Sequence, residues 1–206
     1  MPAMDKKKVI GLTGTYCAGK NHIAAILEAH GLPVLDLDKL GHLVLETEKK
    51  TLVDRFGEGI LGSGATVDRK LLGEKVFGSR EKLNALEEII HPGVNRETLS
   101  WINARKEKYC VINAALLHRS SAFDLLDAII IVEAPLIIRL IRAKKRDHLG
   151  WRALINRFRS QNDFHSQYFK GKTDIYRVEN SGFFCTKNQK KTENRIIDIL
   201  SNLGIK

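Results

Sequence analysis

The sequence has few cysteines and lacks any apolar run of membrane-spanning length. Its three cysteines, Cys17, Cys110 and Cys185, are odd in number and widely spaced, a pattern that favours neither a disulfide framework nor a zinc site. The apolar pair Val9–Ile10 is too short for a signal peptide and meets Gly11 at once. Internal repeats and low-complexity linkers are also lacking. We therefore expect a cytoplasmic protein with reduced thiols and no membrane partner.

Acidic residues are outnumbered, and the excess positive charge is unevenly placed. The 206 residues are 43% hydrophobic and 28% charged, which suits one substantial core with a small inserted lobe. The net charge is +10, and residues 139–172 hold ten lysines or arginines against two aspartates. Such a segment suits nucleic acid, an anionic membrane or a phosphorylated substrate, although a solvated helix face is the common alternative.

The most informative segment is Gly14–Asn21, which reads G-x-x-x-x-G-K and then has Asn where Ser or Thr is usual. A short apolar run, Val9–Leu12, predicts a strand before it, and Ile23, Ile26 and Leu27 predict a helix after it. In this setting the backbone N–H groups and the helix N-terminus would bind a nucleotide triphosphate. A chance match in an ordinary turn is the alternative. The expected nucleotide-binding residues are Gly14, Thr15, Tyr16, Cys17, Ala18, Gly19, Lys20, Asn21 and His22.

Two residues of this loop are unusual. Asn21 stands where a hydroxyl would hold Mg²⁺, and its amide oxygen is a weaker ligand of the kind that Mg²⁺ accepts. Cys17 lies near Lys20 and a helix start, where a thiolate would be favoured. Oxidation-sensitive nucleotide binding is one hypothesis for Cys17, and a small residue that merely fits the loop is the other.

Strands and helices alternate along the rest of the chain. Further strands are predicted at residues 33–38, 109–114, 128–133 and, more weakly, 176–179. Residues 39–107 read as helical with an interruption at His91-Pro92, and a last helix ends at Gly204. The order predicts a three-layer α/β domain, whose ligands lie at the carboxyl ends of the strands. Asp36, Asp38 and residues 113–117 would then surround one cleft with the phosphate-binding loop.

Carboxylates and arginines near that cleft suit phosphoryl transfer, which needs a base and positive charge around the phosphates. Asp38 is the better base candidate, with a helix N-cap as its alternative, and Asp36 is otherwise a strand-end turn residue. Arg139, Arg142 and Arg146 fall near helical spacing and would present one basic face. Beside a phosphate-binding loop, a phosphate-clamping lid is the better interpretation of this basic segment.

In these motifs the chain resembles the dephospho-CoA kinases, P-loop enzymes that phosphorylate the 3′-hydroxyl of dephospho-CoA at the end of coenzyme A synthesis. The resemblance covers nearly the whole length. Its motifs are Gly11–Gly14 with Gly19-Lys20, Val34–Asp38, Ile90–Pro92, Leu140–Arg142 with Arg146-Asp147, Arg157-Phe158 with Gln161, and Asn180–Gly182. The ordered series of D-x-D, His-Pro and R-x-x-x-R-D is more specific than the loop alone.

The resemblance implies a nucleoside monophosphate kinase-like fold, with a five-stranded parallel sheet, a helical acceptor-binding insert and a lid. Residues 1–39, 108–138 and 173–206 would form the nucleotide-binding core, residues 40–107 the insert and residues 139–172 the lid. Catalysis would rest on Asp38, Lys20, Arg142 and Arg146, and Asn180 would lie near the adenine or ribose of ATP. The acceptor side would comprise Asp36, Asp38, His91, Leu116, Leu117, Arg157 and Gln161.

The chain also departs from the family pattern. Two loop glycines and both loop hydroxyls are replaced, and Ala115–Arg119 lacks the usual Pro and Glu of P-L-L-x-E. We expect ATP and Mg²⁺ as cofactors, dephospho-CoA as acceptor, and a monomer or small homo-oligomer. Another nucleoside or nucleotide acceptor and a non-catalytic nucleotide-binding relative remain alternatives. The aromatics of the basic segment are explained by a lid core, so we expect no nucleic-acid partner.

Overall fold

The computed structural model describes residues 7–147, 150–159, 168, 173–182 and 186–205. Its strands are β1 Lys8–Gly14, β2 Val34–Asp36, β3 Tyr109–Asn113, β4 Ala128–Glu133 and β5 Asp174–Glu179. Its α-helices are α1 Lys20–Ala29, α2 Leu37–Thr47, α3 Lys49–Phe56, α4 Arg69–Val76, α5 Arg80–Ala104, α6 Leu136–Asp147, α7 Trp151–Arg159 and α8 Thr186–Asn202. Short 3-10 turns are η1 Glu58–Ile60, η2 Leu117–Arg119 and η3 Ser121–Leu125. Among these helices, none has both the length and the apolar character needed to cross a bilayer.

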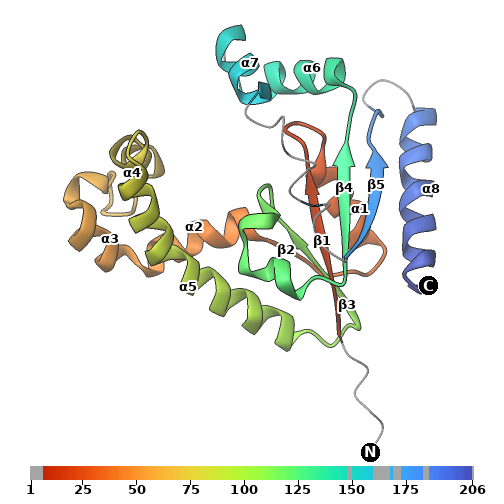
Figure 1. The fold of residues 1–206 in the computed structure, drawn as a ribbon, viewed down its shortest axis with the longest axis horizontal. Helices are drawn as coiled ribbons and strands as arrows, with labels where there is room; N and C mark the ends of the chain where they lie inside the picture. Colours follow the sequence, from red (N-terminus) through yellow and green to blue (C-terminus); the bar gives the residue numbers. More distant parts are fainter. Residues whose placement is uncertain (1–6, 148–149, 160–167, 169–172, 183–185, 206) are drawn as a thin grey trace, which may run out of the picture. The chain divides into compact units, whose positions relative to one another are not determined.

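The chain divides into two compact units, Met1–Leu35 with Lys106–Lys206, and Asp36–Arg105. The first unit holds most of a five-stranded sheet of order β2-β3-β1-β4-β5 (Figure 1). β1 pairs in parallel with β3 and β4, and β4 pairs in parallel with β5. The predicted three-layer α/β fold with a five-stranded parallel sheet is therefore confirmed.

The apolar strand residues explain why the sheet forms. The first five residues of β4 are buried, as expected for a parallel strand covered on both faces. Ile10, Leu12 and Ile130 pack with Ile23 and Leu27 of α1 in the main core, to which α8 also contributes. α1 ends where predicted, because Gly31 adopts a left-handed φ of 81° and its N–H bonds the Glu28 carbonyl.

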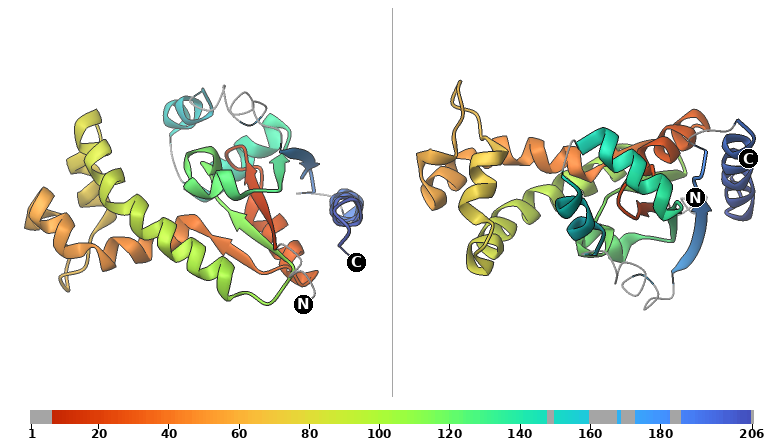
Figure 2. Two further views of the ribbon diagram at one scale, coloured as in Figure 1. Left: turned by 60° about the horizontal axis from the view of Figure 1, so that its bottom comes forward. Right: turned by 90° about the horizontal axis from the view of Figure 1, so that it is seen from above.

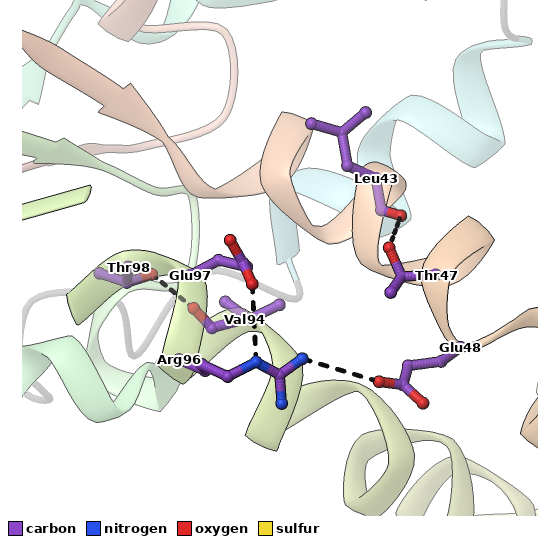
Figure 3. A network of polar contacts seen from close by, with 7 residues as sticks. All are labelled: Leu43, Thr47, Glu48, Val94, Arg96, Glu97 and Thr98. Carbon is purple, nitrogen blue, oxygen red and sulfur yellow. Dashed lines mark hydrogen bonds and ion pairs between the residues drawn. The ribbon is translucent and has the colours of Figure 1, made fainter. Parts of the chain in front are cut away.

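In the second unit, α2 and α5 pack through a close approach of small and branched residues. A Cβ atom on Gly93 would lie 2.7 Å from Val44 Cγ1, so only glycine allows this contact. Figure 3 shows the polar rim of the same contact, where Arg96 lies 4.0 Å from Glu48 and 3.6 Å from Glu97. Arg96 is mostly exposed, so these ion pairs add little to stability and the apolar contact holds the helices together.

Two sequence-based expectations about these elements were wrong. The second strand ends at Asp36 rather than at Asp38, because Asp36 Oδ1 accepts hydrogen bonds from the N–H groups of Asp38 (3.0 Å) and Lys39 (3.2 Å) and starts α2. His91-Pro92 does not interrupt a helix, since α5 runs from Arg80 to Ala104 with Pro92 inside it. Buried positions lie on both sides of Pro92, and their packing offsets the helix bond that proline removes.

Candidate functional site

The phosphate loop, Gly14–Asn21, connects β1 to α1 and has the curled backbone that anion binding requires. Cys17 and Gly19 both adopt left-handed conformations, with φ of 60° and 91°. The loop is closed by hydrogen bonds from the N–H of Thr15 to the Val132 carbonyl (3.2 Å) and from the N–H of Ala18 to the Thr15 carbonyl (2.9 Å). Alternating left-handed residues turn backbone N–H groups inward and form an anion-binding nest.

Arginines of α6 bind the carbonyl oxygens on the outside of this loop. Arg139 Nε donates to the Tyr16 carbonyl (2.8 Å), and Arg142 Nη1 donates to the carbonyls of Ala18 (3.0 Å) and Cys17 (3.5 Å). Figure 2 shows α6 beyond the carboxyl end of β4, where it meets the loop. Because N–H and C=O point in opposite directions in a trans peptide, the N–H groups that follow Tyr16 and Ala18 are directed away from the arginines.

Asn180, just after β5, locks the same segment from a second side. It is 4% exposed, and its Nδ2 donates to the Ala18 carbonyl (2.9 Å). Its own carbonyl accepts from Arg142 Nη2 (3.1 Å), and its N–H bonds the Glu133 carbonyl (2.7 Å). The ends of β4 and β5, α6 and the phosphate loop are thus joined by one set of hydrogen bonds.

Lys20 and Asn21 begin α1 directly after this curl. The Lys20 ammonium nitrogen is shielded from solvent. Asn21 Oδ1 accepts a hydrogen bond from Asn113 Nδ2 (3.4 Å) at the end of β3. Asn113 is 2% exposed, and its buried Oδ1 has no hydrogen-bond partner within the described part of the chain. The Asn113 side chain thus meets Asn21 through its amide nitrogen, and its own amide oxygen is left unsatisfied. Amide oxygens such as these are ligands that a hard cation such as Mg²⁺ accepts.

Two hollows lie near α6, and they differ in chemistry. One of about 350 Å³ borders the phosphate loop and is lined by Thr15, Glu133, Ala134, Pro135, Arg139 and Glu179. The larger, of about 450 Å³, is lined by Ile137, Leu140, Ile141, Lys144, Lys145 and Trp151. The larger hollow is almost entirely apolar, so it does not suit a polyphosphate, whereas the smaller one lies at the strand ends where α/β proteins bind ligands.

Comparison with known proteins identifies the family. The family model for dephospho-CoA kinase matches residues 8–181. The chain belongs to the dephospho-CoA kinase family. A dephospho-CoA kinase from Halalkalibacterium halodurans is 32% identical over 198 residues, covering 93% of this chain and 94% of that protein. Another, from Bacillus licheniformis, is 30% identical over 201 residues, covering 95% and 98%.

Solved structures share the fold of this chain. A crystal structure from Thermus thermophilus matches with a TM-score of 0.80 and 28% identity, covering 96% of this chain and 98% of that one. The dephospho-CoA kinase from Campylobacter jejuni matches with a TM-score of 0.62 and 22% identity, covering 95% and 97%, which supports the fold alone. The dephospho-CoA kinase family and its P-loop kinase fold, predicted from the sequence motifs, are therefore confirmed.

The other residues that the family resemblance implied as site residues lie in several separate parts of the structure. Asp36, Asp38 and His91 belong to the unit Asp36–Arg105, where Asp36 caps α2 and His91 is exposed on α5. Leu116 is 48% exposed, whereas Leu117 is fully buried and packs against Gly11. Arg157 lies on α7, and Gln161 lies outside the described residues.

One expectation about charge differs from the structure. A thiolate is not favoured at Cys17, because burial raises the pKa of its thiol and outweighs the lowering by Arg146. Arg142 donates its guanidinium N–H groups to the Ala18 carbonyl of the loop and to the Asn180 carbonyl. Arg142 thus shapes the loop in this structure.

Sequence reasoning missed one buried polar cluster beneath the loop. The Tyr168 hydroxyl lies 3.3 Å from Thr13 Oγ1 and 3.1 Å from His118 Nδ1, and Tyr168 is 1% exposed. Burial lowers the pKa of His118 and raises that of Tyr168, so both side chains favour their neutral forms. The three residues are far apart in sequence, and no local pattern signals their contact.

Proposed function

We propose that this chain transfers the γ-phosphoryl group of ATP to the 3′-hydroxyl of dephospho-CoA. The observation that carries the proposal is the phosphate loop, whose outer carbonyls are held by Arg139, Arg142 and Asn180. That bracing leaves the inner N–H groups for the phosphates of a nucleotide. Membership of the dephospho-CoA kinase family supports the choice of acceptor. The few, separated cysteines support a cytoplasmic location.

On the ATP side, two residues would neutralise the charge that develops during transfer, and a third would hold the loop. Lys20 would reach the β- and γ-phosphates from the start of α1, as P-loop lysines do. Arg146 would add positive charge from the end of α6. Asn180 would hold the phosphate loop rather than contact the adenine of ATP, since its side-chain amide is bonded to the Ala18 carbonyl.

Mg²⁺ would be held mainly by ATP oxygens and water, with Asn21 and Asn113 as the protein oxygens beside it. When bound, the ion would offset the negative charge of the phosphates. Asn113 Oδ1 supports this placement, because it is buried and has no hydrogen-bond partner among the described residues. Because both ligands are neutral amides, we expect weaker retention of Mg²⁺ than at a loop with a hydroxyl and a carboxylate.

On the acceptor side, Asp38 would accept the proton of the attacking hydroxyl or orient it. The N-cap of α2 is Asp36, so the competing structural explanation for Asp38 as a cap no longer applies. Asp38 instead lies in the first turn of α2. A carboxylate within reach of the hydroxyl is the group that kinases use for this task.

Direct assay tests the proposal. Purified protein with ATP and Mg²⁺ is offered dephospho-CoA and a panel of nucleosides, and the phosphorylated product is measured. We expect turnover of dephospho-CoA. Turnover of a nucleoside alone would overturn the acceptor, and ATP binding without any turnover would indicate a non-catalytic relative.

Asp38→Asn separates catalysis from binding. We expect ATP binding to persist and turnover to fall by about 10²–10⁴-fold, the usual range for a general base. Asp54→Asn is the matched control, because Asp54 is an exposed carboxylate on α3 in the same unit. Unchanged turnover in Asp38→Asn would reject Asp38 as the base.

A further inference from the structure

Tyr16, in the middle of the phosphate loop, is packed between side chains of α6 and α7. The Arg146 guanidinium carbon lies 5.2 Å from the centre of the Tyr16 ring. Phe158 of α7 meets the same ring edge-on, with centroids 5.3 Å apart and planes at 75°. A guanidinium over an aromatic face is attracted by the ring quadrupole, and an edge-on aromatic pair is a favoured geometry.

The Tyr16 hydroxyl extends this packing into a polar contact. It donates a hydrogen bond to Oδ2 of Asp147, the last residue of α6. Arg146 donates to the same carboxylate, from Nε to Oδ1 (2.6 Å) and from Nη2 to Oδ2 (3.2 Å). Asp147 is only 15% exposed, against 60% for Arg146, so the carboxylate is the fixed partner and the arginine the accessible one.

The backbone of Tyr16 is held by the same helices. Its carbonyl accepts from Arg139 Nε (2.8 Å), and the Arg139 guanidinium lies 4.8 Å from the centre of the Phe158 ring. Main chain, ring and hydroxyl of Tyr16 therefore each contact α6 or α7. Because its carbonyl, ring and hydroxyl are all held, Tyr16 restricts where the side chains of Arg139 and Arg146 can lie.

We propose that Tyr16 is a positioning residue that fixes Arg146 beside the phosphate loop before ATP binds. The inference rests on the proposed ATP-dependent function. An arginine has five N–H donors, and Asp147 takes two of them, so three remain for phosphate oxygens. The Arg146 guanidinium is already stacked on the Tyr16 ring and hydrogen-bonded to Asp147. Arg146 therefore loses less conformational freedom on ATP binding than an unrestrained arginine would.

Tyr16→Phe tests the proposal by removing only the hydroxyl. Tyr109→Phe is the matched control, because the Tyr109 hydroxyl donates to the Leu203 carbonyl (3.1 Å) away from the loop. Affinity for a non-hydrolysable ATP analogue with Mg²⁺ is measured by calorimetry without acceptor. We expect Tyr16→Phe to weaken binding about fivefold and Tyr109→Phe to leave it unchanged, with similar melting temperatures for both.

A double-mutant cycle tests whether Tyr16 affects ATP binding through Asp147. If Tyr16 acts through Asp147, then Asp147→Asn weakens ATP binding and Tyr16→Phe adds little to it, so the two effects are non-additive. In turnover assays, KM for ATP rises while KM for dephospho-CoA does not. Additive effects, or a fall in melting temperature with unchanged ATP affinity, would show a merely structural Tyr16 and overturn the proposal.

The two proposals fail in different ways. If wild type binds the ATP analogue but does not phosphorylate dephospho-CoA, the proposed acceptor is wrong, and the binding cycle still decides the role of Tyr16. If wild type phosphorylates dephospho-CoA and Tyr16→Phe binds ATP as tightly, only the positioning role is wrong.

Discussion

A Cβ atom on Gly19 would lie 2.2 Å from Nδ2 of Asn180, the atom that holds the Ala18 carbonyl. No side chain can occupy that space while the Asn180 bond persists. Gly19 also has a φ of 91°, which other residues rarely adopt. Position 19 therefore requires glycine for two reasons: its left-handed backbone conformation and the close approach of the Asn180 side chain.

Gly19→Ala should destabilise the fold and abolish tight ATP binding. Left-handed strain costs about 1–2 kcal/mol, and displacing the buried Asn180 amide costs about 1–3 kcal/mol more. Gly64→Ala is the matched control, because Gly64 has a φ of 94° with nothing within 4 Å of its added Cβ. Urea unfolding and ATP calorimetry measure both effects. Equal losses in the two variants would mean that Asn180 yields to the new methyl group.

Cys17→Gly should stabilise the protein. Cys17 has a left-handed φ of 60°, and glycine would relieve about 1–2 kcal/mol of strain, less about 0.5–1 kcal/mol for its greater unfolded freedom. A net gain of about 0.5–1 kcal/mol in the free energy of unfolding is expected. Cys17→Ala removes the thiol but keeps the Cβ, so an equal gain in Cys17→Ala would show that strain is not the cause.

Most of the fold could be predicted because its signals are local. The apolar strands, the glycine that ends α1 and the G-x-x-x-x-G-K loop each lie within a few residues of sequence. The predicted helix break at Pro92 was wrong because the stability of α5 depends on contacts that are not local in sequence. Its helix is stabilised by burial of Gly93, Thr98 and Ile102 in the finished unit, which a local rule on proline does not include.

The candidate site was predictable in its parts and not in its contacts. Arg139, Arg142 and Asn180 were each recognisable as basic or motif residues. Their convergence on the carbonyls of Tyr16, Cys17 and Ala18 depends on α6 and the β5 end meeting the loop, over separations of more than 100 residues. Arginines near a phosphate loop suggest phosphate ligands, so their use as loop braces could come only from the structure.

Asn21→Ser should lower the Mg²⁺ concentration needed for activity. A serine hydroxyl is the usual metal ligand at this position of the loop, and the change gives up only the long Asn113–Asn21 hydrogen bond of 3.4 Å. If the improved contact is worth about 1 kcal/mol, the Mg²⁺ midpoint falls about fivefold. Mg²⁺ titration of turnover at saturating ATP measures it. Asn188→Ser, on α8, is the control, and an unchanged midpoint in Asn21→Ser would remove Asn21 from the metal site.

His118 should make the stability of the fold sensitive to mild acid. Burial, with a smaller effect from Arg119, lowers the pKa of His118 below its ordinary value of 6.5, so the unfolded chain binds the proton more readily than the folded one. Stability is then complete above about pH 6.5 and falls as the pH drops below it. Among the described residues, the Tyr168 hydroxyl faces the ring, and it stays protonated throughout this range.

His118→Asn should flatten this dependence, because asparagine can keep a hydrogen bond to Tyr168 without titrating. The free energy of unfolding in urea is measured from pH 5 to pH 8 for wild type, His118→Asn and His30→Asn. His30→Asn is the control for the loss of a histidine, because His30 lies at an exposed position after α1. A wild-type slope retained in His118→Asn would show that another group binds the proton. A flattened slope would show that His118, buried against the Tyr168 hydroxyl, is the group that binds the proton on unfolding.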